Sequence, residues 1–533
     1  ISFPIRLFPE NIRALNEYPE RNPRGGPISE SNEEITFYQH LPLVPIELRD
    51  HTLSATIAFM NELKPDGKGL STFDLDRIVH AGNIVVPETA LTRGDNHDAY
   101  VRRTDLESIG TVFHRENTTG EVQYRAREEV GAGWLAVGEL ARYSPKFDFF
   151  IQRVRDSEGC IFAYTRFIGG GALPLALALE ANGYTPHPGV RKTGLLANGT
   201  QTPGGRQCAL CPLREKNHGN ADHTFAPAYY GILTGDPAIS PKNDQTIKLQ
   251  RASNNARGDQ MKVIIGSQLA SEGVDLRFVR ETHVIDSWYH LNKTEQILGR
   301  AIRFMSHCLL PKEKRNNTVY LYVAVLPDGP ESRESADLYS YRMGFNKAVL
   351  VGNVTRQMKQ SAIDCNLNKD AIVIANQDPV RQIDSQGVVR NEVNINDSPF
   401  TAVCDWIETC NYKCEPSIDV SEMELDDTTY DEYSARWRVQ VIKTRIQRMF
   451  ALQPFYQSDD FWHMFSKIPR MVIVTVLEDI INNKAFQVTY GDKTGYIRYC
   501  NGYYLFQPNT YLDISIPLAV RTARYPIKRD AYL

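Results

Sequence analysis

The spacing of apolar residues along the chain changes near residue 139. From there to about residue 330, short apolar runs alternate with stretches whose apolar positions recur every three or four residues. The runs predict strands at 160–165, 229–233, 262–265, 283–285 and 319–325, and the periodic stretches predict helices at 173–181, 246–254 and 294–303. Strands separated by helices predict an α/β fold with a parallel sheet built from right-handed crossovers.

The regions on either side of 139–330 lack this alternation. Residues 1–138 are rich in Pro, Asn and Glu and predict only a short helix at 52–63 and a hairpin at 111–125, so we interpret them as an inter-lobe segment. Residues 331–414 predict a helical accessory region, mainly a helix at 335–363. Residues 415–433 contain eight acidic residues and no Lys or Arg, which is typical of a solvated linker.

The last segment, 434–533, predicts a small domain resembling a winged helix. It begins with a helix that has Val439, Ile442, Ile446 and Phe450 on one side and several Lys and Arg residues on the other. A helix at 470–483 follows, and then two strands at 496–499 and 503–506 flank an Asn501-Gly502 turn. The basic side could contact nucleic acid or could simply be a solvated face.

Composition limits the possible partners. A net charge of -4 over 533 residues means that nucleic-acid binding would depend on local basic patches. No apolar run is long enough to span a bilayer, and the chain starts at Ile1 without a signal peptide. Nine scattered cysteines indicate a reducing, intracellular compartment, such as host cytoplasm or a virion if the protein is viral.

In such a compartment, paired cysteines predict a metal site. Cys208, Cys211, His218 and His223 lie in a Gly/Pro/Asn-rich insertion at 202–226 that has little apolar core, and two thiolates with two imidazoles suit tetrahedral Zn²⁺. The alternative is a coincidence of polar loop residues. Cys404, Cys410 and Cys414 have no His close behind them and are better interpreted as buried thiols.

A second group of residues suits phosphate chemistry. Gln296-x-x-Gly299-Arg300-x-x-Arg303 places one amide and two guanidinium groups on one face of a helix. Such cations can neutralise charge on a transferring phosphoryl group, although the segment could also be an exposed basic turn. Some twenty residues upstream, Gly273 and Asp275 follow a strand, where ligands meet the carboxyl edge of a parallel sheet.

The order strand, Gly/Asp loop, strand, Arg helix resembles motifs V and VI of superfamily 2 helicases. Trp288, Glu295 and Ser306-His307 resemble one branch, the helicase-like ATPases of large DNA viruses and linear plasmids, which includes the poxvirus early transcription factor small subunit and nucleoside triphosphate phosphohydrolase I. The resemblance covers residues 139–375 well. It implies a RecA-like second helicase lobe in which Arg300, Arg303 and Gln296 are catalytic and Gly273, Asp275 and Gly299 bind nucleotide.

The same resemblance implies a set of nucleic-acid contacts at the ends of three strands. Thr165 and Arg166, before the run Gly169-Gly170-Gly171, resemble motif IV, and a plain helix cap with flexible glycines is the alternative. The implied contacts are Thr165, Arg166, Thr234, Gly235 and Ser267.

One departure from the family is large. The sequence contains no GxxxxGK[ST] loop, and no Asp-Glu box follows a strand, so we expect that the first lobe, which would hold ATP and Mg²⁺, is absent. We therefore expect the C-terminal part of a longer ATP-dependent helicase or translocase, inactive by itself. Expected partners are the first lobe, a nucleic acid, for which DNA is favoured over RNA, and a viral RNA polymerase or transcription factor subunit. The alternatives are duplex translocation of the chromatin-remodeller type and a non-catalytic scaffold that kept the fold.

Overall fold

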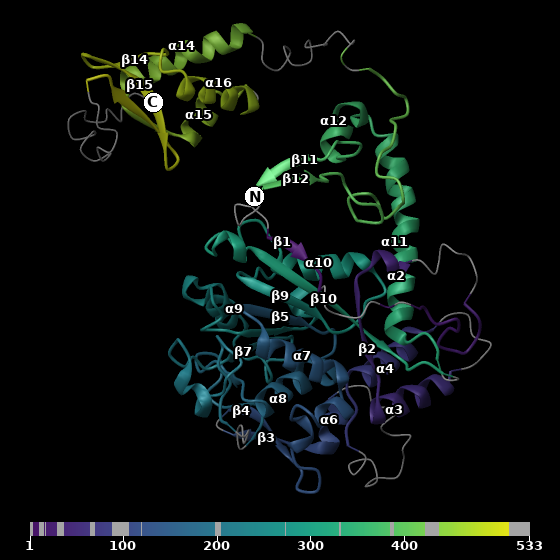
Figure 1. Cartoon of the computed structure of the whole chain (residues 1–533). Coiled ribbons are helices and arrows are strands. Elements are labelled where there is room, and N and C mark those ends of the chain that lie inside the picture. Colours follow the sequence, from purple (N-terminus) through teal and green to yellow (C-terminus); the bar gives the residue numbers. More distant parts are fainter. Residues whose placement is uncertain are drawn as a thin grey trace. The chain divides into compact units, whose positions relative to one another are not determined.

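A computed structural model of the chain describes residues 4–9, 15, 17–28, 37–63, 70–87, 106–118, 120–197, 204–271, 273–329, 332–383, 389–419, 421, 436–468 and 470–510. It divides into two compact units, Ile1–Ile418 and Asp419–Leu533, which are described separately (Figure 1). The finer domain boundaries expected from the sequence remain predictions.

An eight-stranded, wholly parallel sheet forms the centre of the first unit. Its strand order is β1-β10-β9-β5-β8-β7-β6, and β2 also pairs with β10. The strands are β1 Ile5–Leu7, β2 Leu43–Glu47, β5 Cys160–Tyr164, β6 Thr185–Pro186, β7 Tyr229–Leu233, β8 Val263–Gly266, β9 Val279–Val284 and β10 Asn316–Val325. The predicted α/β class with a parallel sheet is confirmed, and the sheet is consistent with a RecA-like lobe.

Helices cover both faces of this sheet, which is why its central strands are apolar throughout. In β5, Ile161 and Ala163 face a core shared with α7 (Pro145–Asp156) and α8 (Leu173–Ala181). Phe162 and Tyr164 face the opposite core, shared with α10 (Leu291–Ala301) and α11 (Ala336–Gln360). The predicted helix at 173–181 matches α8, whereas α10 and α9 (Asn243–Arg251) each begin three residues before the predicted start.

The segment before residue 139 contributes to the same unit. It contains α2 (Phe37–His40), α3 (Asp50–Asn61), α4 (Thr72–Asn83), α6 (Leu106–Val112) and the hairpin of β3 (Phe113–Thr118) and β4 (Glu121–Ala126), which confirms the predicted helix and hairpin. Strands β1 and β2 were not predicted. β1 has only three residues, and β2 contains Pro45, which is tolerated because β2 is an edge strand.

A small disulfide-bonded region follows α11. It contains α12 (Cys365–Ile372) and the hairpin of β11 (Val380–Ile383) and β12 (Val389–Val393). Cys365 is bonded to Cys414, and Cys404 is bonded to Cys410. Cys404, Cys410 and Cys414 are buried as expected, but the expectation that they are free thiols is wrong. The reason is tertiary, because α12 lies against the loop that carries the other three cysteines and brings Cys365 beside Cys414.

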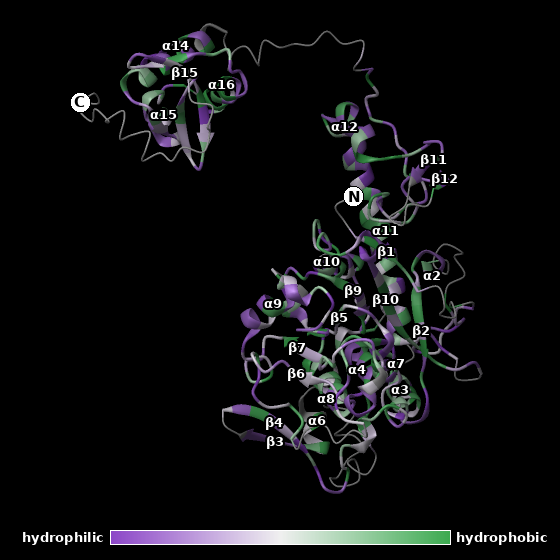
Figure 2. Ribbon diagram, turned by 60° about the vertical axis from the view of Figure 1, so that its left-hand side comes forward, coloured by the Kyte–Doolittle hydropathy of each residue, from purple (hydrophilic) through white to green (hydrophobic). Residues whose placement is uncertain are grey.

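The second unit packs three helices on a four-stranded antiparallel sheet of order β13-β16-β15-β14. Its elements are α14 (Arg436–Leu452), β13 (Phe455–Gln457), α15 (Ser458–Met464), α16 (Arg470–Asn482), β14 (Val488–Tyr490), β15 (Lys493–Cys500) and β16 (Tyr503–Pro508). Ile442, Ile446 and Phe450 are buried as predicted. Helix α16, which is largely hydrophobic (Figure 2), adds Val472, Ile473, Val476, Leu477 and Ile480 to the same core. Positive φ angles at Asn501 and Gly502 confirm the predicted turn. Of the predicted acidic linker, residues 422–433 lie outside the described residues.

Across the described part of the chain, no helix has the length and apolar character that crossing a bilayer requires.

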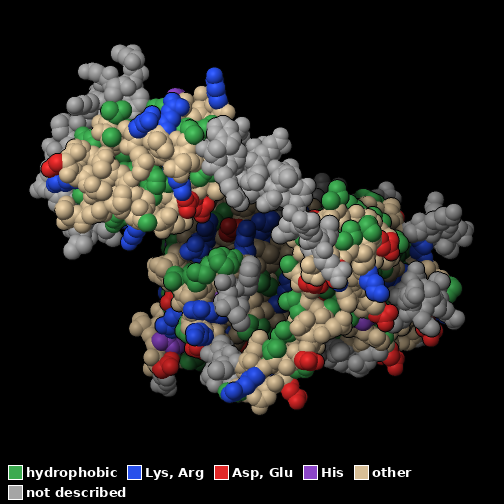
Figure 3. All heavy atoms as spheres, turned by 90° about the horizontal axis from the view of Figure 1, so that it is seen from above, with side chains coloured by type: hydrophobic (Ala, Val, Ile, Leu, Met, Phe, Trp, Pro, Cys, Tyr) green, Lys and Arg blue, Asp and Glu red, His purple; other side chains and the backbone are tan. Residues whose placement is uncertain are grey.

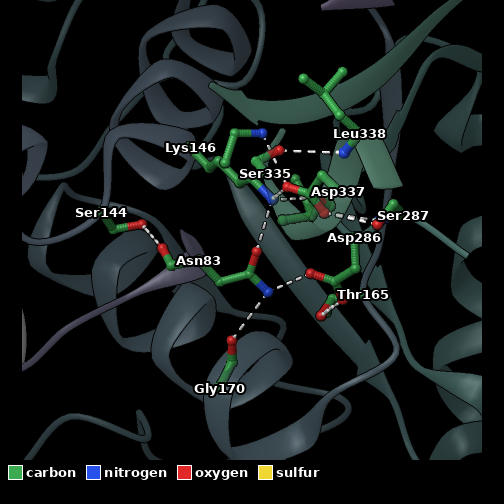
Figure 4. Close-up of polar contacts among 12 residues, drawn as sticks. Asn83, Ser144, Lys146, Thr165, Gly170, Asp286, Ser287, Ser335, Asp337 and Leu338 are labelled. Atoms are coloured by element: carbon green, nitrogen blue, oxygen red, sulfur yellow. Dashed lines mark hydrogen bonds and ion pairs between the residues drawn. The ribbon is translucent and has the colours of Figure 1, made fainter. Parts of the chain in front are cut away.

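A buried ion pair joins α7 to α11 near the carboxyl end of β9. The Lys146 ammonium lies 2.6 Å from the Asp337 carboxylate, and both side chains are almost wholly inaccessible to solvent. Lys146 also donates to the Asn83 side-chain oxygen at 3.0 Å and to the Ile285 carbonyl at 3.1 Å. Asp337 accepts bonds from the Ser287 hydroxyl and the Ala324 backbone. Figure 4 shows these groups converging from separate elements.

Removing the Lys146 ammonium should destabilise the first unit severely. Lys146→Met leaves the Asp337 carboxylate buried without its cation, and breaking a buried pair in this way costs about 3–5 kcal/mol. Urea-induced unfolding would measure the loss. Arg155→Ala is the control, because the Arg155–Asp156 pair is exposed and should contribute less than about 1 kcal/mol. A loss below about 1 kcal/mol for Lys146→Met would contradict the expectation.

Candidate functional site

The arginine helix lies beside the loop that follows β8. Helix α10 carries Gln296 and Arg300 outside the core, while Ile297 and Leu298 are buried in it. Arg303 lies two residues beyond the end of α10, so the prediction that all three side chains share one face of a helix is wrong: the backbone leaves the helical conformation at Ile302. Asp275 forms an ion pair with Arg303, and the Leu276 N–H donates to the Arg300 carbonyl at 3.0 Å. The structure therefore brings together Asp275, Arg300 and Arg303, as the sequence predicted for one site.

Two glycines lie in this region, one in the loop before Asp275 and one in α10. Gly273 has a φ of 69°, a conformation that favours glycine, and a side chain there would be strained even though the space around it is open. Gly299 is partly exposed on α10, and an added Cβ would meet no atom within 4 Å. The Arg303 guanidinium is paired with Asp275 at an exposed position beside α10, and a guanidinium there suits an anionic ligand.

The predicted nucleic-acid contacts lie at the carboxyl ends of three neighbouring strands. Thr165 and Arg166 follow β5, Ser267 follows β8, and Thr234 and Gly235 follow β7, and these strands are adjacent in the sheet. Thr234 and Ser267 are buried, and the Thr234 hydroxyl lies 2.7 Å from that of Ser240. Gly235 is exposed.

Arg166 is enclosed rather than open to solvent. Its guanidinium lies 2.7 Å from the Asp76 carboxylate of α4, and the Arg166 side chain is 4% exposed. The rings of Phe167 and Trp288 lie 4.6 and 5.3 Å from the guanidinium carbon. Burial raises the pKa of Asp76, whereas Arg166 opposes that rise. A phosphate reaching this loop would compete with Asp76 for the guanidinium.

Several polar residues around this loop were missed from the sequence: Asp76, Asn83, Lys146, Asp286 and Asp337. Asp286 accepts from the Thr165 hydroxyl at 2.5 Å and from the Arg166 N–H at 2.7 Å. Its position directly after β9 could have identified it, since strand-end carboxylates commonly serve sites. Asn83 and Asp76 come from α4, far away in sequence, and no local pattern singles them out.

The four predicted metal ligands converge. One ligand atom from each of Cys208, Cys211, His218 and His223 lies within 4.8 Å of the others. The Nε2 atom of His223 is 3.5 Å from the Cys208 sulfur and 3.2 Å from Nε2 of His218. Tetrahedral Zn²⁺ with bonds of about 2.0–2.3 Å requires ligand atoms at this spacing. The cluster could therefore hold zinc.

The surroundings of the cluster favour metal binding. Burial opposes ionisation of Cys208, but hydrogen bonds from backbone N–H groups and from His223 outweigh it and lower the pKa of the thiol to about 6. The Asp222 carboxylate lies 2.7 Å from Nδ1 of His223, which leaves Nε2 directed at the cysteines. These residues fit a structural site with four protein ligands, which needs no open position for substrate.

On the face drawn in Figure 3, the basic side chains of the described residues do not form one continuous surface. In the space-filling view, Lys and Arg side chains occur in separate groups with hydrophobic side chains between them (Figure 3). This distribution agrees with the net charge of -4 and favours local contacts over a broad basic face.

Comparisons with curated proteins place these features in context. No protein-family model matches the chain. An early transcription factor large subunit homologue of African swine fever virus is 26% identical over 375 residues, which cover 66% of this chain and 30% of that protein. A protein of Acanthamoeba polyphaga mimivirus, provisionally named an ATP-dependent RNA helicase, is 26% identical over 422 residues, 69% of this chain and 35% of that protein. The chain is a distant relative of viral helicases and early transcription factor subunits.

A third relative agrees with this assignment. A termination factor NPH-I homologue of African swine fever virus is 25% identical over 244 residues, 43% of this chain and 34% of that protein. The chain spans about a third of the length of these relatives. The resemblance to viral helicase-like proteins is supported at this level, although the early transcription factor relative is a large-subunit homologue and the sequence pattern suggested the small subunit.

Zinc binding gives a direct test of the Cys/His cluster. We expect one Zn²⁺ per chain, lost on Cys211→Ser, with the parallel sheet still folded because the insertion lies at its edge. Asp222→Ala should weaken zinc affinity by about 10-fold or more, because His223 would lose its orienting partner. Elemental analysis and competition with a chelating dye would measure both, with Cys308→Ser as the control. Zinc-free protein from a chelator-free preparation would contradict the prediction.

Proposed function

We propose that the first unit is the second RecA-like lobe of a nucleic-acid-dependent ATPase that acts in viral transcription. The observation that carries the proposal is the meeting of Asp275, Arg300 and Arg303 at one end of α10, beside the loop after β8. Guanidinium groups in this position can neutralise negative charge on a γ-phosphate. The distant similarity to viral helicases supports the same function.

Within this proposal each residue of the arginine helix has a role. Arg300 and Arg303 would approach the γ-phosphate, and Gln296 would order the groups around it. Asp275 pairs with Arg303 and would orient it, and Gly273 and Gly299 would let the backbone approach the ligand. ATP and Mg²⁺ would be held mainly by a phosphate loop and an Asp-Glu box on another lobe, because this sequence has no GxxxxGK[ST] loop and no Asp-Glu pair that follows a predicted strand.

The strand ends at β5, β8 and β7 form the proposed nucleic-acid contact. Thr165, Arg166, Thr234, Gly235 and Ser267 lie along one edge of the sheet in that strand order. The proposed partners are DNA and a subunit of the viral transcription machinery. The relatives named as transcription factor subunits support the second partner.

The second unit fits a winged-helix-like accessory domain. Its helices and strands follow the order helix, strand, helix, helix and then three antiparallel strands, and the short first strand β13 pairs with the last strand β16. The zinc site would be structural, because its four protein ligands would complete a tetrahedral shell.

The ATPase proposal has a two-part test. The chain alone should hydrolyse no ATP, because it lacks the phosphate loop. Joined to a lobe that carries the loop, it should hydrolyse ATP, and Arg300→Ala or Arg303→Ala should reduce turnover on the order of 10³-fold because the γ-phosphate loses its cation. Arg277→Ala is the control, since Arg277 is exposed near the same loop but lies outside the proposed site.

Two outcomes would refute this assignment. Turnover by the chain alone that disappears in Arg300→Ala would show that a first lobe is not required. Unchanged turnover of both arginine variants in the joined protein would remove the proposed role of α10. Nucleic-acid binding without turnover in the joined protein would instead favour the non-catalytic scaffold.

The Asp76–Arg166 pair predicts a gain of affinity. If a phosphate of the nucleic acid must displace Asp76, then Asp76→Asn should tighten binding, by about 3-fold to 10-fold for a charge-assisted bond of about 1 kcal/mol. Fluorescence anisotropy with labelled oligonucleotides would measure this. Asp74→Asn, on the same helix and facing solvent, should have little effect. Weaker binding by Asp76→Asn would show that the pair supports the loop rather than competing with phosphate.

A further inference from the structure

We propose that Asn83 and Asp286 are positioning residues for the loop at residues 165–171, and that they support nucleic-acid binding without touching the nucleic acid. The inference rests on the proposed function, because it assumes that this loop contacts phosphate. It assigns part of that function to α4, which lies in the segment that the sequence suggested was only a connection between lobes.

Asp286 fixes the beginning of the loop. One of its carboxylate oxygens accepts both the Thr165 hydroxyl, at 2.5 Å, and the Arg166 N–H, at 2.7 Å. The Thr165 hydroxyl in turn accepts the Phe167 N–H at 3.4 Å. Three successive residues of the loop therefore depend on one buried carboxylate at the end of β9.

Asn83 fixes the other end of the loop and holds Asp286 itself. Its amide nitrogen donates to the second Asp286 oxygen and lies 3.5 Å from the Gly170 carbonyl. Its amide oxygen accepts from the Lys146 ammonium at 3.0 Å, which determines which way round the amide lies. Figure 4 shows Asn83 between Lys146, Asp286 and Gly170. An amide is required here, because a carboxylate would face Asp286 with like charge.

The glycine run of the loop packs directly against α4, which leaves no room for a side chain at Gly170. A Cβ added at Gly170 would lie 1.8 Å from Nε2 of His80, and one at Gly171 would lie 2.0 Å from the Thr165 hydroxyl. The same helix carries Asp76, His80 and Asn83, which contact Arg166, the glycine run and Asp286 in turn. The position of the proposed phosphate contact is therefore determined by α4.

Two nearby cations explain why the Asp286 carboxylate can stay buried beside Asn83. Burial raises the pKa of Asp286, and Lys146 and Arg166 act against that rise. Lys146 also forms an ion pair with Asp337, at the start of α11. Asp286 is followed by Ser287 and Trp288 and then by α10, so the same carboxylate lies between the proposed nucleic-acid loop and the arginine helix.

The test compares two buried asparagines in the full chain. Asn83→Ala should weaken binding of labelled single-stranded and duplex DNA about 10-fold, measured by anisotropy well below the melting temperature. It should also reduce the slope of log affinity against log salt by about 0.7–0.9, which corresponds to one lost phosphate contact. Asn182→Ala is the matched control, because Asn182 is equally buried and makes three backbone bonds away from the loop. It should lower the melting temperature and leave the salt slope unchanged.

A second variant keeps the inference testable if Asn83→Ala does not fold. Asp286→Asn keeps the size and one acceptor oxygen but loses the charge, and it should weaken binding and reduce the salt slope in the same way. Wild-type affinity and slope in both Asn83→Ala and Asp286→Asn would overturn the inference. So would an equal change of slope in Asn182→Ala.

Arg166→Ala separates the inference from the proposed function. If Arg166→Ala weakens binding but the Asn83 and Asp286 variants do not, only the positioning role fails. If Arg166→Ala and Thr165→Ala both bind as tightly as wild type, or if the wild-type chain binds no DNA, the proposed contact itself is wrong.

Discussion

The ammonium group of Lys146 is the interaction on which the first unit depends most. It lies between the Asp337 carboxylate, the Asn83 amide and the Ile285 carbonyl, all removed from solvent. A lone buried cation would be very costly, so its partners must be present together for the fold to form. They come from α4, the end of β9 and the start of α11. The cluster therefore joins the segment before residue 139, the middle of the sheet and the long helix after it.

The buried cluster around Lys146 also bears on how the loops at the carboxyl ends of the strands keep their conformation. Loops at the carboxyl edge of a parallel sheet have few neighbours of their own, and their conformation must be fixed by side chains from elsewhere. Asp286 and Asn83 do this for the loop after β5, and Asp275 does it for the arginine helix. In both places a carboxylate in a loop next to the sheet holds an arginine-containing segment. The two proposed contacts, with nucleic acid and with nucleotide, are thus built by the same chemical device.

The features that could be predicted from the sequence are those that depend on residues close together along the chain. The strands and helices at 160–325 are encoded by local periodicity, and the Cys/His cluster by close spacing, so the pattern predicted them. The pairing of β1 and β2 with β10 joins residues about 280–310 apart, and neither strand has a strong pattern of its own. The bond between Cys365 and Cys414 similarly needs α12 to be placed before the two sulfurs can meet. Arg166 was predicted as a phosphate contact, but its partner Asp76 is invisible in the sequence because nothing local relates the two residues.

The enclosed state of Arg166 has a consequence for how the two sites could communicate. Its guanidinium lies against the Trp288 ring, and Trp288 leads within three residues into α10, which carries Arg300 and ends two residues before Arg303. A phosphate that drew Arg166 away from Asp76 would also remove a stacking partner from Trp288, and the segment entering α10 would lose one of its contacts. Asp286 opposes a large displacement, because it holds the Arg166 backbone whatever the guanidinium does. The side chain can therefore exchange partners while the main chain stays in place, so a signal from nucleic acid to the arginine helix would pass through the side chains of Arg166 and Trp288 and would not require the sheet to move.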